Sequence, residues 1–162
     1  NRSAARNNGV KNSNSDIVII IDADNYIPIA QIYDAIEEAK QKNILIKPFH
    51  MFGYLTEEST RYFYDTGNFE TNPQFLDTPS YNFNGGAYVM KKSLWESVGG
   101  MDENFIGWGA EDDAFHILCE AKLGRVYYVN GYDYHLYHPA KRKTSSYNYD
   151  RLMRNYVRNK KL

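Results

Sequence analysis

Three consecutive carboxylates, Glu111, Asp112 and Asp113, end the segment 107–113, which also holds two glycines and a tryptophan. The apolar residues that follow have helical spacing, so the acids stand at the start of a helix. Negative side chains at that position interact favourably with the helix dipole. Alternatively, one of them accepts a proton from a substrate in a cleft. The segment alone leaves both interpretations open.

A second acidic group, Asp22 and Asp24, directly follows the β-branched run 17–21. Such a run predicts a strand that is covered on both faces, and open α/β sheets bind ligands at the carboxyl ends of their strands. Because residues two apart in a strand point the same way, both carboxylates can face one Mg²⁺ or Mn²⁺ ion that bridges to a substrate diphosphate. Aspartate also ends strands as an ordinary turn residue. A phosphatase of the haloacid-dehalogenase type, which uses Asp-x-Asp after an apolar strand, is a competing interpretation.

Other polar groups stand later in the chain. His135 and His138 are three residues apart, and an imidazole from one of them can complete a metal site begun by the acidic pair. Asn84 precedes Gly85 and Gly86, which predicts either backbone amides close to a substrate or a plain turn. The basic stretch 141–143 predicts either a segment that closes over phosphate groups or a solvated surface.

The bulk composition narrows the function. The 162 residues make one ordinary domain, and 19 basic residues balance 20 acidic ones, so no nucleic-acid partner is expected. The single cysteine, Cys119, excludes a disulfide framework and favours a reducing compartment, the cytoplasm. A basic C-terminal helix predicts peripheral contact with the inner face of a membrane. The 15 tyrosines suit interfaces and sugar faces, or an exposed β surface.

The hydrophobic pattern predicts an α/β chain in which strands and helices alternate. The predicted helices cover residues 3–13, 28–42, 91–98, 111–123 and 149–160, and the predicted strands cover 17–21, 44–47, 50–55, 87–90, 125–129 and 132–137. Residues 56–81 are predicted to be loops with a short helix. Since an α/β domain usually builds several strands before a central buried one, we expect that the first strands of a larger domain precede this chain.

Four stretches together resemble GT-A glycosyltransferases, in particular the β-1,4-galactosyltransferase family and bacterial family-2-like inverting transferases. They are residues 1–9, Asp22-Ala23-Asp24, 83–100 and 107–113, the last of which matches a Gly-Trp-Gly-x-Glu-Asp-Asp signature nearly letter for letter. The resemblance implies a Rossmann-like mixed sheet flanked by helices that lacks its N-terminal nucleotide-binding strands. It assigns residues 1–140 to the C-terminal part of a catalytic domain and leaves 141–162 as a basic loop and C-terminal helix.

The resemblance also implies a metal site. Asp24, supported by Asp22, would hold Mn²⁺ (or Mg²⁺) against the diphosphate of the sugar donor, with UDP as the expected nucleotide. The family has a histidine ligand after its last core strands, and His135 and His138 match that position equally well. Arg2 would lie near the nucleotide.

The remaining implied roles concern the two sugars. Asp112 falls on the position of the catalytic base, and Glu111 on that of an acceptor-binding carboxylate. Trp108 would flank the donor and acceptor sugars, and Gly85 and Gly86 belong to the segment beneath them. An acceptor hydroxyl needs such a base because it is a poor nucleophile at neutral pH.

The leading hypothesis is therefore a metal-dependent, inverting hexosyltransferase. Its partners would be a nucleoside-diphosphate sugar and a hydroxyl of a saccharide or glycoconjugate, in polysaccharide biosynthesis. The phosphatase alternative leaves the segment 107–113 and both histidines without a role. A non-catalytic sugar-binding module is the second alternative, since the fold can persist without turnover.

Overall fold

The computed structural model describes residues 1–139 and 145–158. Its helices are α1 (Arg2–Asn12), α2 (Ile29–Gln41), α3 (Glu57–Thr66), α4 (Lys92–Val98), α5 (Glu111–Leu123) and α6 (Ser146–Leu152), which the π-helical segment η1 (Met153–Arg158) continues. Its strands are β1 (Ile17–Ile21), β2 (Asn25–Tyr26), β3 (Ile46–Lys47), β4 (Met51–Tyr54), β5 (Ser80–Tyr81), β6 (Ala87–Lys91), β7 (Tyr127–Tyr128) and β8 (Tyr132–His135). The predicted phosphate-closing stretch 141–143, and the end of the predicted last helix, lie outside the described residues.

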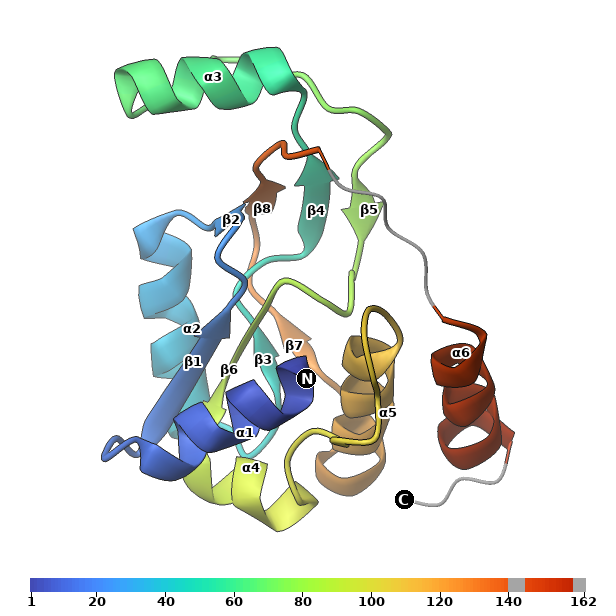
Figure 1. Cartoon of the computed structure of the whole chain (residues 1–162). Coiled ribbons are helices and arrows are strands. Elements are labelled where there is room, and N and C mark those ends of the chain that lie inside the picture. The colour runs from blue at the N-terminus through green and yellow to red at the C-terminus, as the bar shows by residue number, and fades with distance from the viewer. Residues whose placement is uncertain (140–144, 159–162) are drawn as a thin grey trace.

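The strands form two mixed sheets (Figure 1). The first has the order β1-β6-β3-β7, in which β6 is antiparallel to both of its neighbours and β7 is parallel to β3. The second has the order β2-β8-β4-β5, in which β8 is antiparallel to β2 and parallel to β4. The mixed α/β architecture predicted from the sequence is therefore confirmed.

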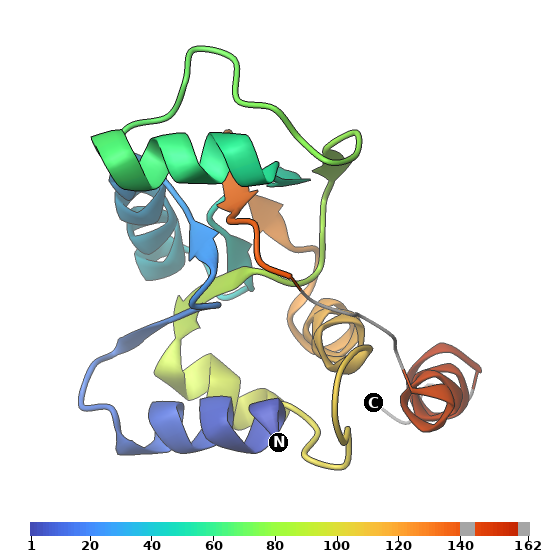
Figure 2. The same ribbon diagram turned by 45° about the horizontal axis from the view of Figure 1, so that its top comes forward.

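Helices cover both faces of the first sheet. The side chains of β6 alternate between these two faces and pack against the helices on each of them. Val89 packs with α2 on one face. Tyr88 and Met90 point to the other face, where they join α1, α4 and α5 in the largest core cluster. Figure 2 shows α1 and α4 side by side at one end of the molecule and α3 across the other. This layering brings the N-terminus of α1 and the N-terminus of α5 to the same side of the sheet.

The predicted elements are present with modest shifts at their ends. The predicted loop region 56–81 contains α3 and also the short strand β5. The strands β2 and β5 were not predicted, because a two-residue strand carries no hydrophobic period to detect. The last helix begins at Ser146 rather than near residue 149, since the Ser145 side chain accepts a hydrogen bond from the Asn148 amide and caps it.

The expected double coverage of the first strand is wrong. Among the described strands β1 pairs with β6 alone, so it lies at the edge of its sheet. Ile19 and Ile21 are 39% and 42% exposed, while Val18 is buried. A run of isoleucine and valine predicts a strand, but it does not reveal what covers each face.

The C-terminal helix packs against the rest of the molecule. Leu152 and Tyr156 belong to the same core cluster as Phe115 of α5, and Figure 1 shows α6 beside α5. Arg151, one of the basic residues of this helix, forms an ion pair of 2.6 Å with Asp102. Residues 145–158 thus share the core of residues 1–139. No described helix has the length and apolar character required to cross a bilayer.

Candidate active site

One cleft of ≈ 950 Å³ lies where the end of β1, the start of β6 and the first turns of α1 and α5 meet. Every residue to which the sequence analysis gave a catalytic, metal-binding or substrate-binding role by the family resemblance contributes to its wall. These residues are Arg2, Asp22, Asp24, Gly85, Gly86, Trp108, Glu111, Asp112, His135 and His138. Residues more than a hundred positions apart therefore meet in one place.

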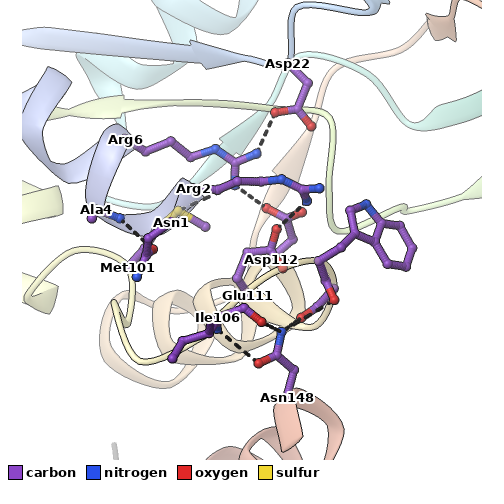
Figure 3. Close-up of polar contacts among 12 residues, drawn as sticks. Asn1, Arg2, Ala4, Arg6, Asp22, Met101, Ile106, Glu111, Asp112 and Asn148 are labelled. Atoms are coloured by element: carbon purple, nitrogen blue, oxygen red, sulfur yellow. Dashed lines mark hydrogen bonds and ion pairs between the residues drawn. The ribbon is translucent and has the colours of Figure 1, made fainter. Parts of the chain in front are cut away.

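A tight loop delivers the first turn of α5 to this cleft. Gly107, Gly109 and Ala110 all have positive φ, at 84°, 97° and 71°, a conformation that is strained for the alanine. The fully buried side chain of Asn148, from α6, holds the loop (Figure 3). Its amide donates to the carbonyls of Ile106 at 3.1 Å and Gly109 at 2.9 Å, and its oxygen accepts from the Ile106 amide at 3.2 Å. The sequence analysis did not identify Asn148.

The three acids of α5 have three different partners. Glu111 pairs with Arg2 at 2.8 Å, Asp112 pairs with Arg6 at 2.7 Å, and Asp113 accepts a hydrogen bond of 2.7 Å from Asn84. They therefore do more than complement the helix dipole, and each has its own position and chemistry.

Asp112 is anchored through one oxygen. Its Oδ1 accepts hydrogen bonds from Arg6 at 2.7 Å and from the Tyr88 hydroxyl at 2.5 Å, and the described hydrogen bonds to this carboxylate all fall on Oδ1. The side chain is 22% exposed, and Oδ2 lies close to Gly85, where an added Cβ would stand 3.2 Å from it. A carboxylate held in this way has its second oxygen available to accept a proton.

Arg6 connects the two acidic motifs (Figure 3). Its guanidinium contacts Asp112 through Nη1 and Asp22 through Nη2, the latter at 2.5 Å. Burial alone would lower the pKa of Arg6, but the charges of Asp112 and Asp22 outweigh it and raise that pKa, so the side chain stays cationic. The sequence analysis did not identify Arg6. Its position four residues after Arg2 was a usable signal, because residues with this spacing share one face of a helix.

Glu111 is almost completely buried, at 3% exposure. Arg2 binds its Oε1, while Oε2 has no hydrogen-bond partner among the described residues. The guanidinium of Arg2 also lies 6.0 Å from the centre of the Trp108 ring. Because buried polar atoms are usually satisfied, the free oxygen of Glu111 is suited to accept a hydrogen bond from a bound molecule.

The two aspartates of the Asp-x-Asp motif do not point to a common place, which corrects the sequence argument. The strand ends at Ile21, and residues 22–25 form a turn closed by a 3.1 Å hydrogen bond from the Asn25 amide to the Asp22 carbonyl. The alternation of side chains in a strand therefore does not apply. Asp22 pairs with Arg6, and burial raises its pKa although the arginine opposes this. Asp24 points to the histidines.

Asp24, His135 and His138 form a cluster whose ligand atoms all lie within 4.8 Å of one another. The pairing of β2 with β8 positions it, since Asn25 is opposite His135 and the Leu136 amide donates to the Asp24 carbonyl. Asp24 Oδ2 is 3.3 Å from Nε2 of His135 and 2.9 Å from Nε2 of His138. The sequence left open which histidine completes the site, and the structure brings both to Asp24.

This cluster fits a divalent metal ion of the first transition series. Two ligand atoms at about 2.1 Å from one ion, roughly at right angles, lie about 3 Å apart, which matches both distances from Asp24. Imidazole nitrogens suit transition metals, whereas Mg²⁺ prefers oxygen ligands. The donor set therefore suits a transition-metal ion better than Mg²⁺.

Beneath the cleft lie two buried charged side chains that the sequence analysis did not identify. Lys47 donates to the carbonyls of Asn84, at 2.8 Å, and Gly85. Burial lowers the pKa of Lys47 to about 7, against the opposing charges of nearby aspartates. Burial likewise raises the pKa of Asp133 to about 7, although a hydrogen bond from a neighbouring amide opposes this.

The glycine pair is explained by this packing. Gly86 has φ of 86°, and a Cβ added there would collide with Oδ2 of Asp133. A Cβ added to Gly85 would lie 2.9 Å from the Phe83 ring. Both glycines line the cleft, but the close approach they permit is to side chains of the protein itself.

The buried ammonium of Lys47 predicts a pH dependence of stability. In the unfolded chain its pKa is near 10.5, and in the folded protein about 7, so between these values the unfolded state binds more protons. The free energy of unfolding should therefore rise with pH, by at most about 1.4 kcal/mol per pH unit. Urea unfolding measured between pH 7.5 and pH 8.5 should show this slope in the wild type and lose it in Lys47→Met.

The middle of this pH range is chosen because Lys47 dominates there. Asp133, whose pKa burial raises to about 7, acts in the opposite direction up to and just above pH 7, and Cys119, whose thiol pKa burial raises from 9.0 to about 12, does so as the pH reaches 9. The matched control is Lys40→Met, at an exposed lysine of α2. Equal slopes in the two variants would contradict the assignment.

Comparison with known proteins gives two family matches. Residues 1–98 match the family described as glycosyl transferase family 2, and residues 69–139 match the one described as the N-terminal domain of galactosyltransferase. The first match includes Arg6 and the Asp-x-Asp turn, and the second includes the acids of α5 and both histidines. A search of curated proteins found no match.

Proposed function

Because this chain belongs to glycosyl transferase family 2 and has the GT-A fold, we propose that it is a metal-dependent, inverting glycosyltransferase. The donor is a nucleoside-diphosphate sugar, with UDP as the expected nucleotide, and the acceptor is a hydroxyl of a saccharide or glycoconjugate. The observation that carries the proposal is the meeting of Asp112 with the cluster of Asp24, His135 and His138 on one cleft.

The roles follow from the contacts. Oδ2 of Asp112 takes the proton of the acceptor hydroxyl while the hydroxyl oxygen bonds to the anomeric carbon. The bond from that carbon to the diphosphate oxygen breaks on the opposite face, which inverts the configuration. Arg6 and Tyr88 hold the base in place through Oδ1. Asp24, His135 and His138 would hold a metal ion, which would supply positive charge to offset the negative charge of the departing diphosphate.

The other residues of the cleft bind substrate. Oε2 of Glu111, buried and without a partner among the described residues, accepts a hydrogen bond from an acceptor hydroxyl. The indole of Trp108 packs against a sugar face. We assign Arg2 and Asp22, which also line the cleft, to contacts with the nucleotide. We also assign residues 145–158 a supporting role, since Asn148 holds the loop before α5.

The alternatives are distinguishable. The phosphatase interpretation depended on the Asp-x-Asp turn, and the family match accounts for that turn. A non-catalytic sugar-binding module would have the same cleft but would not catalyse sugar transfer. We expect the purified protein, screened against UDP-sugars with Mn²⁺, to release UDP from one of them, and to do so faster with an acceptor present. Stereochemistry of the transferred sugar, read by NMR, tests inversion. Stable binding of UDP without turnover on any donor would favour the module.

A further inference from the structure

A second cavity, here called the side pocket, opens beside the cleft. Its volume is ≈ 640 Å³, within the range of roughly 300–1,000 Å³ for small-molecule sites. Tyr54, Trp108, His135 and His138 line both the side pocket and the cleft. The two cavities therefore adjoin one another along these four side chains, and an acceptor in the cleft can reach the side pocket past them.

The rest of the side pocket is apolar and aromatic. Leu55, Leu76, Tyr137 and Pro139 complete its wall, which includes no aspartate, glutamate, lysine or arginine among the described residues. The cleft, by contrast, carries several carboxylates and Arg2. Among the described residues, a phosphate group would meet no lysine or arginine side chain in the side pocket, which favours an uncharged ligand.

Backbone hydrogen bonds hold the walls in place. The Leu76 amide donates to the Tyr54 carbonyl at 2.8 Å, and the Leu55 amide donates to the His135 carbonyl at 2.9 Å. The Tyr137 amide donates to the hydroxyl of Thr60, in α3, at 2.9 Å. The pocket is thus preformed, which lowers the entropic cost of binding.

The proposed base does not line the side pocket, and the side pocket meets the metal cluster only through its two histidines. Asp112 lines the cleft and not the side pocket, and the same is true of Arg2 and Asp22, near which the proposed function positions the nucleotide. The wall away from the histidines therefore faces a part of the substrate that does not react, and binding energy from such remote parts can be used to position the reacting ones.

We propose that the side pocket binds the uncharged sugar unit next to the one that receives the new bond, so that the acceptor is a disaccharide or longer. The proposal rests on the proposed function. Tyrosine and indole rings stack on the C–H faces of pyranoses, and the phenol hydroxyls can bind sugar hydroxyls. Leu76 is 55% exposed, so the pocket is open to solvent and suits a hydrated sugar better than a buried acyl chain.

The test compares acceptors that differ by one unit. Glucose, galactose and N-acetylglucosamine are paired with cellobiose, lactose and N,N′-diacetylchitobiose, and with the octyl β-glycosides of the same monosaccharides. Binding is measured by saturation-transfer NMR with Mn²⁺ and UDP present, and KM and kcat are measured wherever transfer occurs. We expect one disaccharide to bind about tenfold more tightly than its monosaccharide.

Two substitutions in the side pocket test whether the gain in disaccharide affinity arises there. Leu76→Ala and Tyr137→Ala should each abolish the tenfold advantage, while leaving UDP affinity and the monosaccharide KM unchanged. Ile29→Ala, at an exposed isoleucine outside both cavities, is the matched control and should keep the advantage.

Three outcomes would overturn the proposal. One is equal binding of every disaccharide and its monosaccharide, and another is a preference for the octyl glycosides, which would indicate an apolar aglycone. The third is loss of UDP affinity in the side-pocket variants, which would place the nucleoside there. Failure of the proposed function appears separately, as absence of UDP release from every donor, and retained disaccharide binding that needs Leu76 would then still support the pocket.

Discussion

Replacement of Asp112 by asparagine is expected to lower the kcat of sugar transfer by about 10²- to 10⁴-fold. The amide has the shape of the carboxylate but cannot take a proton from the acceptor hydroxyl. Its oxygen can still accept the hydrogen bonds from Arg6 and Tyr88, so the fold should persist. Steady-state kinetics with the donor found in the screen give the loss, and Mn²⁺ and UDP binding should remain.

The control is the same change one residue further along the helix. Asp113→Asn keeps an oxygen that can accept the hydrogen bond from Asn84, and activity should stay within a few-fold of the wild type. Full activity of Asp112→Asn would refute the assignment of the base. An equal loss of activity in both variants would show that catalysis depends on the negative charge of the first turn of α5 and not on a proton transfer to Asp112.

Removal of Asp24 should have the second large effect. Ligand binding stabilises the folded state by about 2.7 kcal/mol at a concentration of 100 times Kd, which corresponds to about 5 to 10 °C in Tm for a protein of this size. We expect Mn²⁺ with UDP to produce such a rise, and Asp24→Ala to abolish it together with activity, because this carboxylate touches both imidazoles. Thermal unfolding monitored by circular dichroism measures the shift.

Three comparisons sharpen that experiment. Asp34→Ala, at an exposed carboxylate of α2, should keep the full shift. Mg²⁺ should give a smaller shift than Mn²⁺, since two of the three ligands are imidazoles. UDP without a metal ion should give less than UDP with Mn²⁺. A full shift in Asp24→Ala would mean that the metal binds elsewhere.

The elements were predictable because they depend on local pattern. The run of β-branched residues in β1, the glycines around α4 and the acids before an apolar helix in α5 each carry a signal within a few neighbouring residues. The site residues were predictable for the same reason: unusual polar groups at the ends of elements are visible in the sequence. All of them line one cleft.

The pairing of those residues was not predictable. Arg6 is 106 positions from Asp112, and Asn148 is 42 positions from Ile106, so no local rule joins them. Lys47 in a short strand gave no sign that its ammonium would lie under the glycine pair. The separation of Asp22 from Asp24 depended on where β1 ends, and a strand boundary is the least certain part of any sequence pattern.

The sequence by itself determined the kinds of group in this protein: an acidic run at a helix start, an acidic pair after a strand, and two histidines near the last strand. Tertiary structure alone decided which of them act together. Asp24 contacts both histidines because β2 lies against β8. Asp22 pairs with Arg6 because α1 crosses to the start of α5. Residue types follow from local chemistry, but partners follow from how distant elements pack.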